Sequence, residues 1–242
     1  MEFHDLDDTC ILHNCIAGAC KHNIEEFLAK KCGVSAKRAH SLRVEHFRNY
    51  GSSLAGSLHS VTTFIQMSII ATCTETLPYE QIAPDPQLVK LLRSIPQPKI
   101  LFTNSDQAHV QKVLKRLSVD EDCFQGLDAT AASAKVTLKP SAAAIEAAVG
   151  FTGFDPRRTL FVDDNERNIA AGKAVGLITA LRAKTKEADY LLNNIHDLGR
   201  VVPQMGLRGV LKEEEEKEKE EEVDKMRSEL GSIRPPPTPI QA

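Results

Sequence analysis

Short apolar segments alternate with helical segments through the second half of this 242-residue chain. Residues 99–102, 159–162 and 177–181 have the length and composition of buried strands. Residues with helical spacing of apolar side chains separate each of these segments from the next. Strands and helices that alternate in this way form a parallel sheet with helices on both faces. The pattern predicts an α/β fold with a doubly wound parallel sheet, in which residues 177–181 form the last strand.

Capping residues predict where several helices begin and end. Asp85 followed by Pro86 combines a preferred N-cap with a proline in the first turn. Ser141 is expected to cap a later helix, which should stop at Gly150. By contrast, the first strand is confined to the few residues before Asp5, fewer than the five or so that are usual for a strand.

The net charge of −3 conceals an uneven distribution, because residues 212–230 carry ten acidic side chains against five basic ones. The rest of the chain is close to neutral, which favours neither nucleic acid nor an anionic membrane as a partner. No secretory signal opens the chain, and no apolar segment is long enough to span a bilayer. We expect a cytoplasmic protein that contacts no nucleic acid and no membrane, and the pattern favours no particular oligomeric state.

Six cysteines are too few and too widely spread for a secreted disulfide framework, so they are expected to be reduced thiols. Cys10, Cys15 and Cys20 recur at steps of five residues, with His13 and His22 nearby. Zinc sites usually pair cysteines at closer spacing. Packing is therefore the favoured role of these side chains.

Asp5 and Asp7 are separated by one residue at the end of the predicted first strand. Alternate residues of an extended segment point to the same side, so both carboxylates can face one site. Carboxylate oxygens are ligands that Mg²⁺ accepts readily. An acidic cluster alone is more often a solvated turn, and the interpretation depends on its partners.

Further polar residues follow the other predicted strands directly. Thr103 and Asn104 come after one strand, Asp163 and Asp164 come after another, and Lys139 precedes a capped helix. Ligands of an open parallel sheet bind outside the carboxyl ends of its strands. These polar residues could simply begin four unrelated loops. One shared binding site explains their positions better.

The order of these motifs resembles the haloacid dehalogenase superfamily. The resemblance is carried by residues 5–9 (DLDDT), 50–56 (YGSSLAG), 77–80 (LPYE), 102–106 (FTNSD) and 163–172 (DDNERNIAAG). In detail they are similar to its pyrimidine 5′-nucleotidase-like branch, especially the plant members. The resemblance covers residues 2–203 apart from two patches. It implies a Rossmann-like catalytic core at 1–13 and 84–205, and a small helical cap inserted after the first strand at 14–83. Composition predicts a charged, disordered tail at 206–242.

The resemblance also implies a role for each motif residue. Asp5 would attack the substrate phosphorus, and Asp7 would protonate the leaving group and then activate water. Mg²⁺ would be held by Asp5, the Asp7 carbonyl, Asp163 and Asp164, while Thr103, Asn104 and Lys139 would bind the phosphoryl group. Dehalogenases of the superfamily lack the second aspartate, so Asp7 favours a phosphatase that acts on a small phosphorylated metabolite.

The chain departs from the family pattern in four places: the short first strand with His4 beside Asp5, residues 57–76, residues 127–136, and the loop after Leu181. These departures keep a second hypothesis open, in which the chain is a catalytically impaired phosphate-binding or regulatory protein. Within the enzyme hypothesis, a nucleoside monophosphate is the expected substrate. A phosphoglycolate or sugar-phosphate phosphatase is the alternative.

Overall fold

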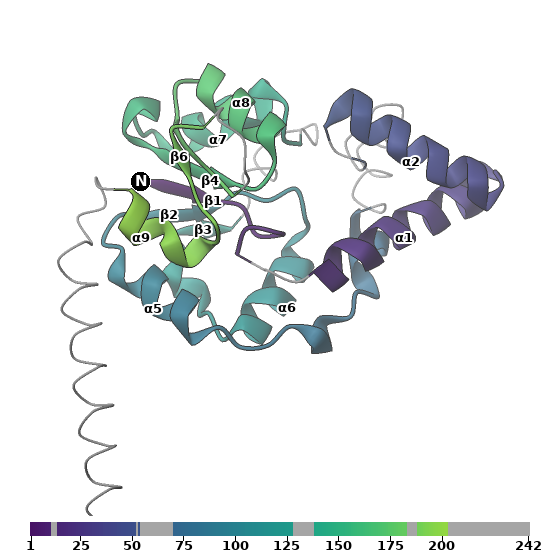
Figure 1. Cartoon of the computed structure of the whole chain (residues 1–242), viewed down its shortest axis with the longest axis horizontal. Coiled ribbons are helices and arrows are strands. Elements are labelled where there is room, and N and C mark those ends of the chain that lie inside the picture. Colours follow the sequence, from purple (N-terminus) through teal and green to yellow (C-terminus); the bar gives the residue numbers. More distant parts are fainter. Residues whose placement is uncertain (11–13, 52, 54–69, 128–137, 183–187, 203–242) are drawn as a thin grey trace, which may run out of the picture.

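The computed structural model describes residues 1–10, 14–51, 53, 70–127, 138–182 and 188–202. A twisted sheet occupies the middle of the molecule, helices cover it, and a pair of helices projects to one side (Figure 1). Among the described helices, none is long and apolar enough to cross a membrane.

Within the described residues the sheet has six strands in the order β3-β2-β1-β4-β5-β6, and every neighbouring pair is parallel. The strands are β1 (Glu2–His4), β2 (Lys99–Leu101), β3 (Gly126–Leu127), β4 (Leu160–Asp163), β5 (Ile178–Leu181) and β6 (Tyr190–Leu191). The α/β fold with a parallel, doubly wound sheet is thereby confirmed.

The helices alternate with these strands as the apolar spacing predicts. The α-helices are α1 (Asn14–Cys32), α2 (Ala36–Tyr50), α5 (Pro86–Ser94), α6 (Gln107–Leu117), α7 (Ala142–Thr152), α8 (Glu166–Ala174) and α9 (Leu198–Val201). Four 3-10 turns complete the described elements: η1 (Tyr79–Gln81), η2 (Glu121–Cys123), η3 (Pro156–Arg158) and η4 (Ile195–Asp197).

Two apolar layers hold the sheet from opposite faces. On one face, α7 and α8 pack against Phe3, Phe102 and Phe161. On the other face, α5, α6 and α9 pack against strand residues that include Leu101 and Val162. Alternate residues of each strand therefore supply opposite layers, and the strand ends are left free to carry polar groups.

The first strand is short but central, because β2 and β4 pair with it on either side. Its ladder continues past the strand, where the Asp5 N–H donates to the Val162 carbonyl at 2.9 Å. His4 is fully buried beside Asp5, and its Nε2 lies 2.7 Å from Oε2 of Glu2. Two paired neighbours thus support three residues that would be weak as an edge strand.

Two sequence predictions need correction, and one further strand was not predicted. The helix after Ser141 does not stop at Gly150 but continues to Thr152, because Gly153 is the residue that takes the left-handed conformation, with φ 67°. β5 is not the last strand, since β6 follows it, and β3 is a further strand directly after Phe124-Gln125. Both missed strands have only two residues, too few to show an apolar pattern.

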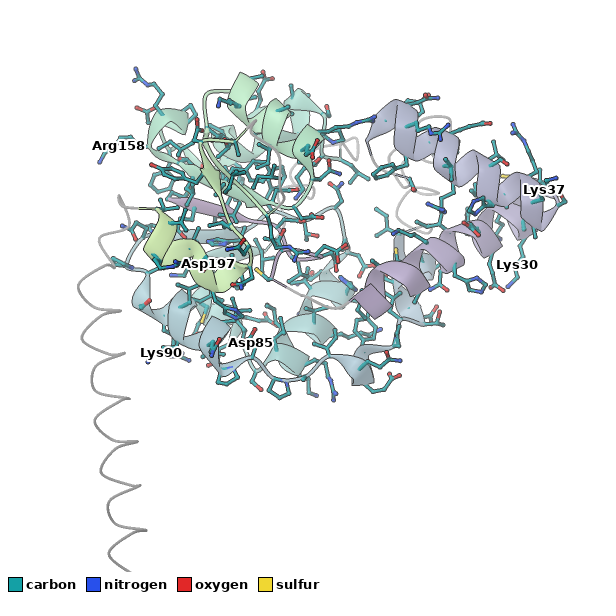
Figure 2. The ribbon with its side chains drawn as sticks, viewed as in Figure 1. Lys30, Lys37, Asp85, Lys90, Arg158 and Asp197 are labelled. Carbon is teal, nitrogen blue, oxygen red and sulfur yellow. The ribbon has the colours of Figure 1, made fainter. Side chains whose placement is uncertain are left out.

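The helical segment after β1 is held by a third apolar cluster. Ile24 and Leu28 of α1 pack with Ala39 of α2, and with Ile70 and Cys73 of the helical residues 70–75. Lys30 and Lys37 mark the far tip of the α1/α2 pair (Figure 2). The predicted limits of the core, cap and tail stay predictions. Residues 206–242, most of 57–76 and nearly all of 127–136 lie outside the described residues.

The C-terminal end of α2 is attached to the core through α8. Nη1 of Arg167 donates to the Phe47 carbonyl at 3.1 Å, and Nδ2 of Asn165 donates to the Gly51 carbonyl at 3.2 Å. Gly51 ends α2 with φ 74°, a conformation that glycine adopts without strain. A β-carbon at this position would lie 2.6 Å from Cγ of Pro140. Only glycine fits this junction without a backbone shift.

The replacement Gly51→Ala is expected to destabilise the protein by about 1–3 kcal/mol, because it adds left-handed strain to a steric clash. Urea denaturation measures the change. The matched control is Gly18→Ala in α1, where a β-carbon meets nothing within 4 Å. Alanine should leave stability unchanged there or raise it by up to about 1 kcal/mol. Equal effects of the two replacements would contradict this account of the junction.

Candidate active site

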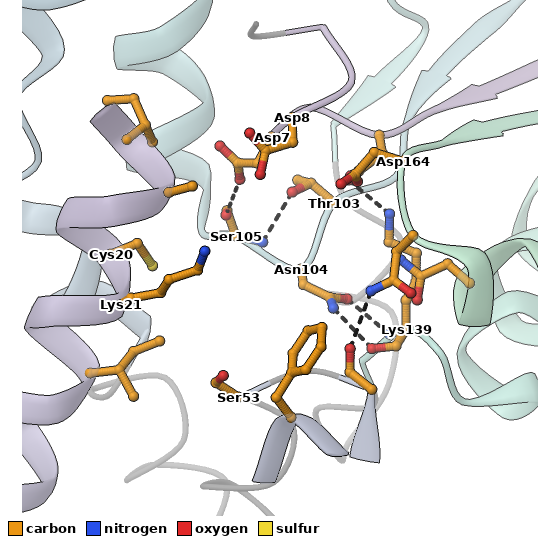
Figure 3. Close-up of a pocket in the computed structure, with 18 of the residues that line it drawn as sticks. Asp7, Asp8, Cys20, Lys21, Ser53, Thr103, Asn104, Ser105, Lys139 and Asp164 are labelled. Carbon is orange, nitrogen blue, oxygen red and sulfur yellow. Dashed lines mark hydrogen bonds and ion pairs between the residues drawn. The ribbon is translucent and has the colours of Figure 1, made fainter. Parts of the chain in front are cut away.

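A cavity of about 700 Å³ lies between the carboxyl ends of the strands and the α1/α2 pair. The predicted site residues Asp5, Asp7, Thr103, Asn104, Lys139 and Asp164 all line it. Figure 3 shows Asp7, Thr103, Asn104, Lys139 and Asp164 on one side of the cavity, with Lys21 of α1 on the opposite wall. Asp163 is fully buried and contacts the cavity residue Lys139.

Lys139 is the centre of the hydrogen-bond network. Its Nζ donates to Oδ1 of Asp5 at 2.8 Å, to Oδ2 of Asp163 at 2.8 Å, and to the Phe102 carbonyl at 2.6 Å. The side chain is 1% exposed, and its pKa is raised because the two carboxylates outweigh the effect of burial. These acceptors use all three of its N–H donors. In this arrangement Lys139 offsets the charge of Asp5 and Asp163 directly.

Asn104 fixes the backbone of Lys139 from two directions. Its Oδ1 accepts the Lys139 N–H at 2.8 Å, and its Nδ2 donates to the Lys139 carbonyl at 3.0 Å. Thr103 is buried beside it and accepts the Ser105 N–H through Oγ1 at 3.1 Å, which leaves the Thr103 hydroxyl proton to donate into the cavity. The segment after β2 therefore both builds the site and offers it a donor.

Asp5, Asp163 and Asp164 form a group of carboxylates that could hold a metal ion, with one oxygen from each within 4.8 Å of the others. Asn168 donates to both oxygens of Asp163, at 2.9 and 3.0 Å, and orients it. Oxygen ligands of this kind suit a hard divalent cation. The predicted Asp7 contribution was a backbone carbonyl, so its side chain is not expected in this group.

The carboxylates carry more negative charge than Lys139 can balance. Burial raises the pKa of Asp5, and the charges of Asp163 and Asp164 raise it further against the lowering by Lys139. Burial and the charges of Asp163 and Asp8 also raise the pKa of Asp164, to about 7. A divalent cation would relieve this excess, so the donor set fits Mg²⁺.

Asp7 is set apart from this group and is held by two side chains of the segment after β2. Oγ of Ser105 donates to Asp7 Oδ2 at 2.8 Å, and Nε2 of His109 lies 2.8 Å from Asp7 Oδ1. Burial opposes ionisation, but these two partners lower the pKa of Asp7 overall. The Asp7 side chain is 34% exposed, whereas His109 is almost fully buried.

All the residues predicted for the site are brought to one place, but Ser105 and His109 were missed. Their positions in the sequence could have indicated them. Ser105 directly follows the strand-end residues Thr103 and Asn104. His109 lies in the first turn of α6, three residues after the N-cap Asp106. Only structure showed that this turn faces Asp7.

Residues 5–176 match the haloacid dehalogenase-like hydrolase family. Because this match spans well over half of the 242 residues, the chain belongs to that family. The match begins at Asp5 and ends beyond Asp164, so it contains every residue of the candidate site.

Several solved structures share the fold at low sequence identity. A variant of CbbY from Rhodobacter sphaeroides, in complex with xylulose-(1,5)bisphosphate, has TM-score 0.58 and 17% identity over 82% of this chain and 95% of that chain. A HAD phosphatase from Thermococcus onnurineus has TM-score 0.53 and 17% identity, covering 83% and 96%. L-2-haloacid dehalogenase from Xanthobacter autotrophicus has TM-score 0.53 and 14% identity, covering 82% and 96%. These likenesses support the fold, and the proteins include a phosphatase and a dehalogenase.

The replacement Lys139→Met is expected to destabilise the protein by about 3–5 kcal/mol, since it leaves Asp5 and Asp163 buried without their cation. Urea denaturation without added divalent cation measures this loss. The control Lys37→Met, at the exposed tip of α2, should change stability by less than about 0.5 kcal/mol. A loss at Lys139 no larger than at Lys37 would show that the buried ammonium does not hold the site together.

Affinity for a divalent cation is expected to fall on acidification, because a protonated Asp164 is a poor ligand. With the pKa of Asp164 raised to about 7, binding at pH 6 should be about tenfold weaker than at pH 8. Mn²⁺, which accepts the same oxygen ligands, allows measurement by electron paramagnetic resonance. The variant Asp164→Asn should bind weakly and lose this pH dependence, and equal wild-type affinity at both pH values would contradict the assignment.

Proposed function

We propose that the protein is a magnesium-dependent phosphomonoester hydrolase that works through an aspartyl-phosphate at Asp5. The observation that carries this proposal is the position of Asp7: a carboxyl group lines the same cavity as Asp5, held by Ser105 and His109 and partly open to the cavity. A halide leaves without a proton, whereas an alkoxide needs one. A positioned Asp7 therefore favours ester hydrolysis over dehalogenation.

In the first half-reaction, an oxygen of Asp5 attacks phosphorus, and the bond between phosphorus and the ester oxygen breaks. Lys139, bound to Asp5 Oδ1, stabilises the ionised carboxylate and orients it. Asp7 gives its proton to the departing alkoxide. The Thr103 hydroxyl donates a hydrogen bond to a phosphoryl oxygen, and the backbone N–H of Asn104 donates another.

In the second half-reaction, water attacks the phosphorus of the aspartyl-phosphate. Asp7, now a carboxylate, takes the proton of that water, and inorganic phosphate leaves as Asp5 is regenerated. Ser105 and His109 keep Asp7 at one place through both halves. Bound Mg²⁺ would be held by Asp5, Asp163, Asp164 and the Asp7 carbonyl, and would supply positive charge against the phosphoryl oxygens.

The substrate is proposed to be a small phosphorylated metabolite. The cavity volume of about 700 Å³ suits a molecule of this size. Phe47 and Ile24 give the α1/α2 side an apolar wall on which a nucleobase could lie, while Lys21 adds positive charge. The wall supports a nucleoside monophosphate, and the complex of CbbY with a sugar bisphosphate supports a sugar phosphate as the alternative.

The second candidate is a phosphate-binding or regulatory protein without turnover, which the departures from the family pattern suggested. The short β1 was one reason for it, and the pairing of β1 on both sides weakens that reason. A cytoplasmic location agrees with the free thiols of five cysteines: Cys10, Cys20, Cys32, Cys73 and Cys123.

The test is hydrolysis of p-nitrophenyl phosphate by the purified protein, with Mg²⁺ and with EDTA. We expect activity that requires Mg²⁺ and falls at least about 10³-fold in the variant Asp5→Asn, which keeps the size of the side chain but removes the nucleophile. A folded wild-type protein without activity toward this ester or a panel of nucleotides and sugar phosphates would favour the binding protein instead.

A further inference from the structure

We propose that His109 is a positioning residue for Asp7, whose carboxyl group it holds by a hydrogen bond at the place from which Asp7 serves the leaving group. This inference rests on the proposed function and deepens it. It starts from a chain of contacts that leads from the cavity through His109 to Tyr79 and Thr74, on the segment that returns the chain from the helix pair to the core.

The direction of the hydrogen bonds follows from what each group can donate. The Tyr79 hydroxyl lies 2.7 Å from the Thr74 carbonyl and 2.8 Å from Nδ1 of His109. A carbonyl oxygen only accepts, so the single hydroxyl proton of Tyr79 goes to Thr74. The hydroxyl oxygen is then the acceptor for His109, and Nδ1 must carry a hydrogen.

This assignment defines the other side of the ring. With Nδ1 bound to Tyr79, Nε2 on the other side of the ring lies 2.8 Å from Oδ1 of Asp7. This is hydrogen-bond distance, so the ring fixes that oxygen of Asp7 next to the cavity.

The ring has little freedom to leave this position. His109 is 1% exposed, and its backbone N–H donates to Oδ1 of Asp106, the N-cap of α6, at 2.8 Å. Oγ1 of Thr74 donates to the other oxygen of Asp106 at 2.6 Å. The same residue, Thr74, thus supports both the cap of α6 and the hydroxyl that fixes the ring.

The position of the Asp7 carboxyl group matters only for esters whose leaving group needs a proton. An alkoxide leaves as the alcohol after protonation, whereas p-nitrophenolate is stable as the anion. The ratio kcat/KM reports the steps up to loss of the leaving group, so it isolates this difference from the later attack of water. A purely structural role of His109 would lower kcat/KM for both kinds of ester equally.

The experiment compares glycerol 2-phosphate with p-nitrophenyl phosphate for wild type and the variant His109→Gln. We expect kcat/KM to fall about 10²-fold for the alkyl ester and less than about tenfold for the aryl ester. Tyr79→Phe, which keeps the ring but removes the hydroxyl, should shift the two esters in the same direction by a smaller factor, and serves if His109→Gln does not fold. The control is His22→Gln on the exposed face of α1, which should change neither ratio.

Equal losses for the two esters would overturn the inference. A second readout does not depend on turnover: nitrogen-15 spectra of the histidine rings should show Nδ1 of His109 protonated, and Asp7→Asn should shift its Nε2 signal. An unprotonated Nδ1 would also overturn the inference. Wild-type protein inactive toward both esters would contradict the proposed function, while the spectra would still decide how the ring is bonded.

Discussion

The structure depends on one buried ammonium group. Lys139 is 1% exposed, and its three donors bind two aspartates and a backbone carbonyl that come from the ends of β1, β2 and β4. Such a group is tolerated inside a protein only when every donor has a partner and its charge is met. The three central strands must therefore end at the same level, and this requirement sets the register in which they pair.

The same cluster explains why the site is suited to bind a cation. One ammonium faces Asp5, Asp163 and Asp164, and the pKa of Asp164 rises to about 7 because burial and neighbouring carboxylates disfavour its charge. Without a bound cation, this group of carboxylates is therefore electrostatically unfavourable. Excess charge of this kind is common at functional sites, where stability is lower than packing alone would allow.

Sequence predicted the parts of the fold whose signal is local. Asp85 and Pro86 marked the start of α5 because capping and proline geometry act within one turn. The apolar runs marked β2, β4 and β5, and the polar residues after them marked the site, because parallel strands present their carboxyl ends together. β3 and β6 were missed because two residues carry no period, and Gly150 was chosen over Gly153 because sequence does not show which glycine turns left-handed.

The contact between His109 and Asp7 was not predicted, for a different reason. Sequence places the two residues far apart, and nothing local links them. The distance depends on the crossing of α6 over the sheet and on Tyr79, which approaches from the segment beyond the helix pair. Long-range contacts of single polar side chains are the part of a site that patterns of neighbouring residues do not define.

The junction at Gly51 links the C-terminal end of α2 to the carboxylates of the site. Asn165 is fixed by three hydrogen bonds. Its backbone N–H donates to the Asp163 carboxylate, its Oδ1 accepts the Arg167 N–H at the start of α8, and its Nδ2 donates to the Gly51 carbonyl at the end of α2. Arg167 adds a second tether to the same end. Asn165 and Arg167 therefore join the end of α2 to the segment that follows β4. Through Asn165, a displacement of this helix end would reach Asp163, one of the carboxylates that could hold the metal ion.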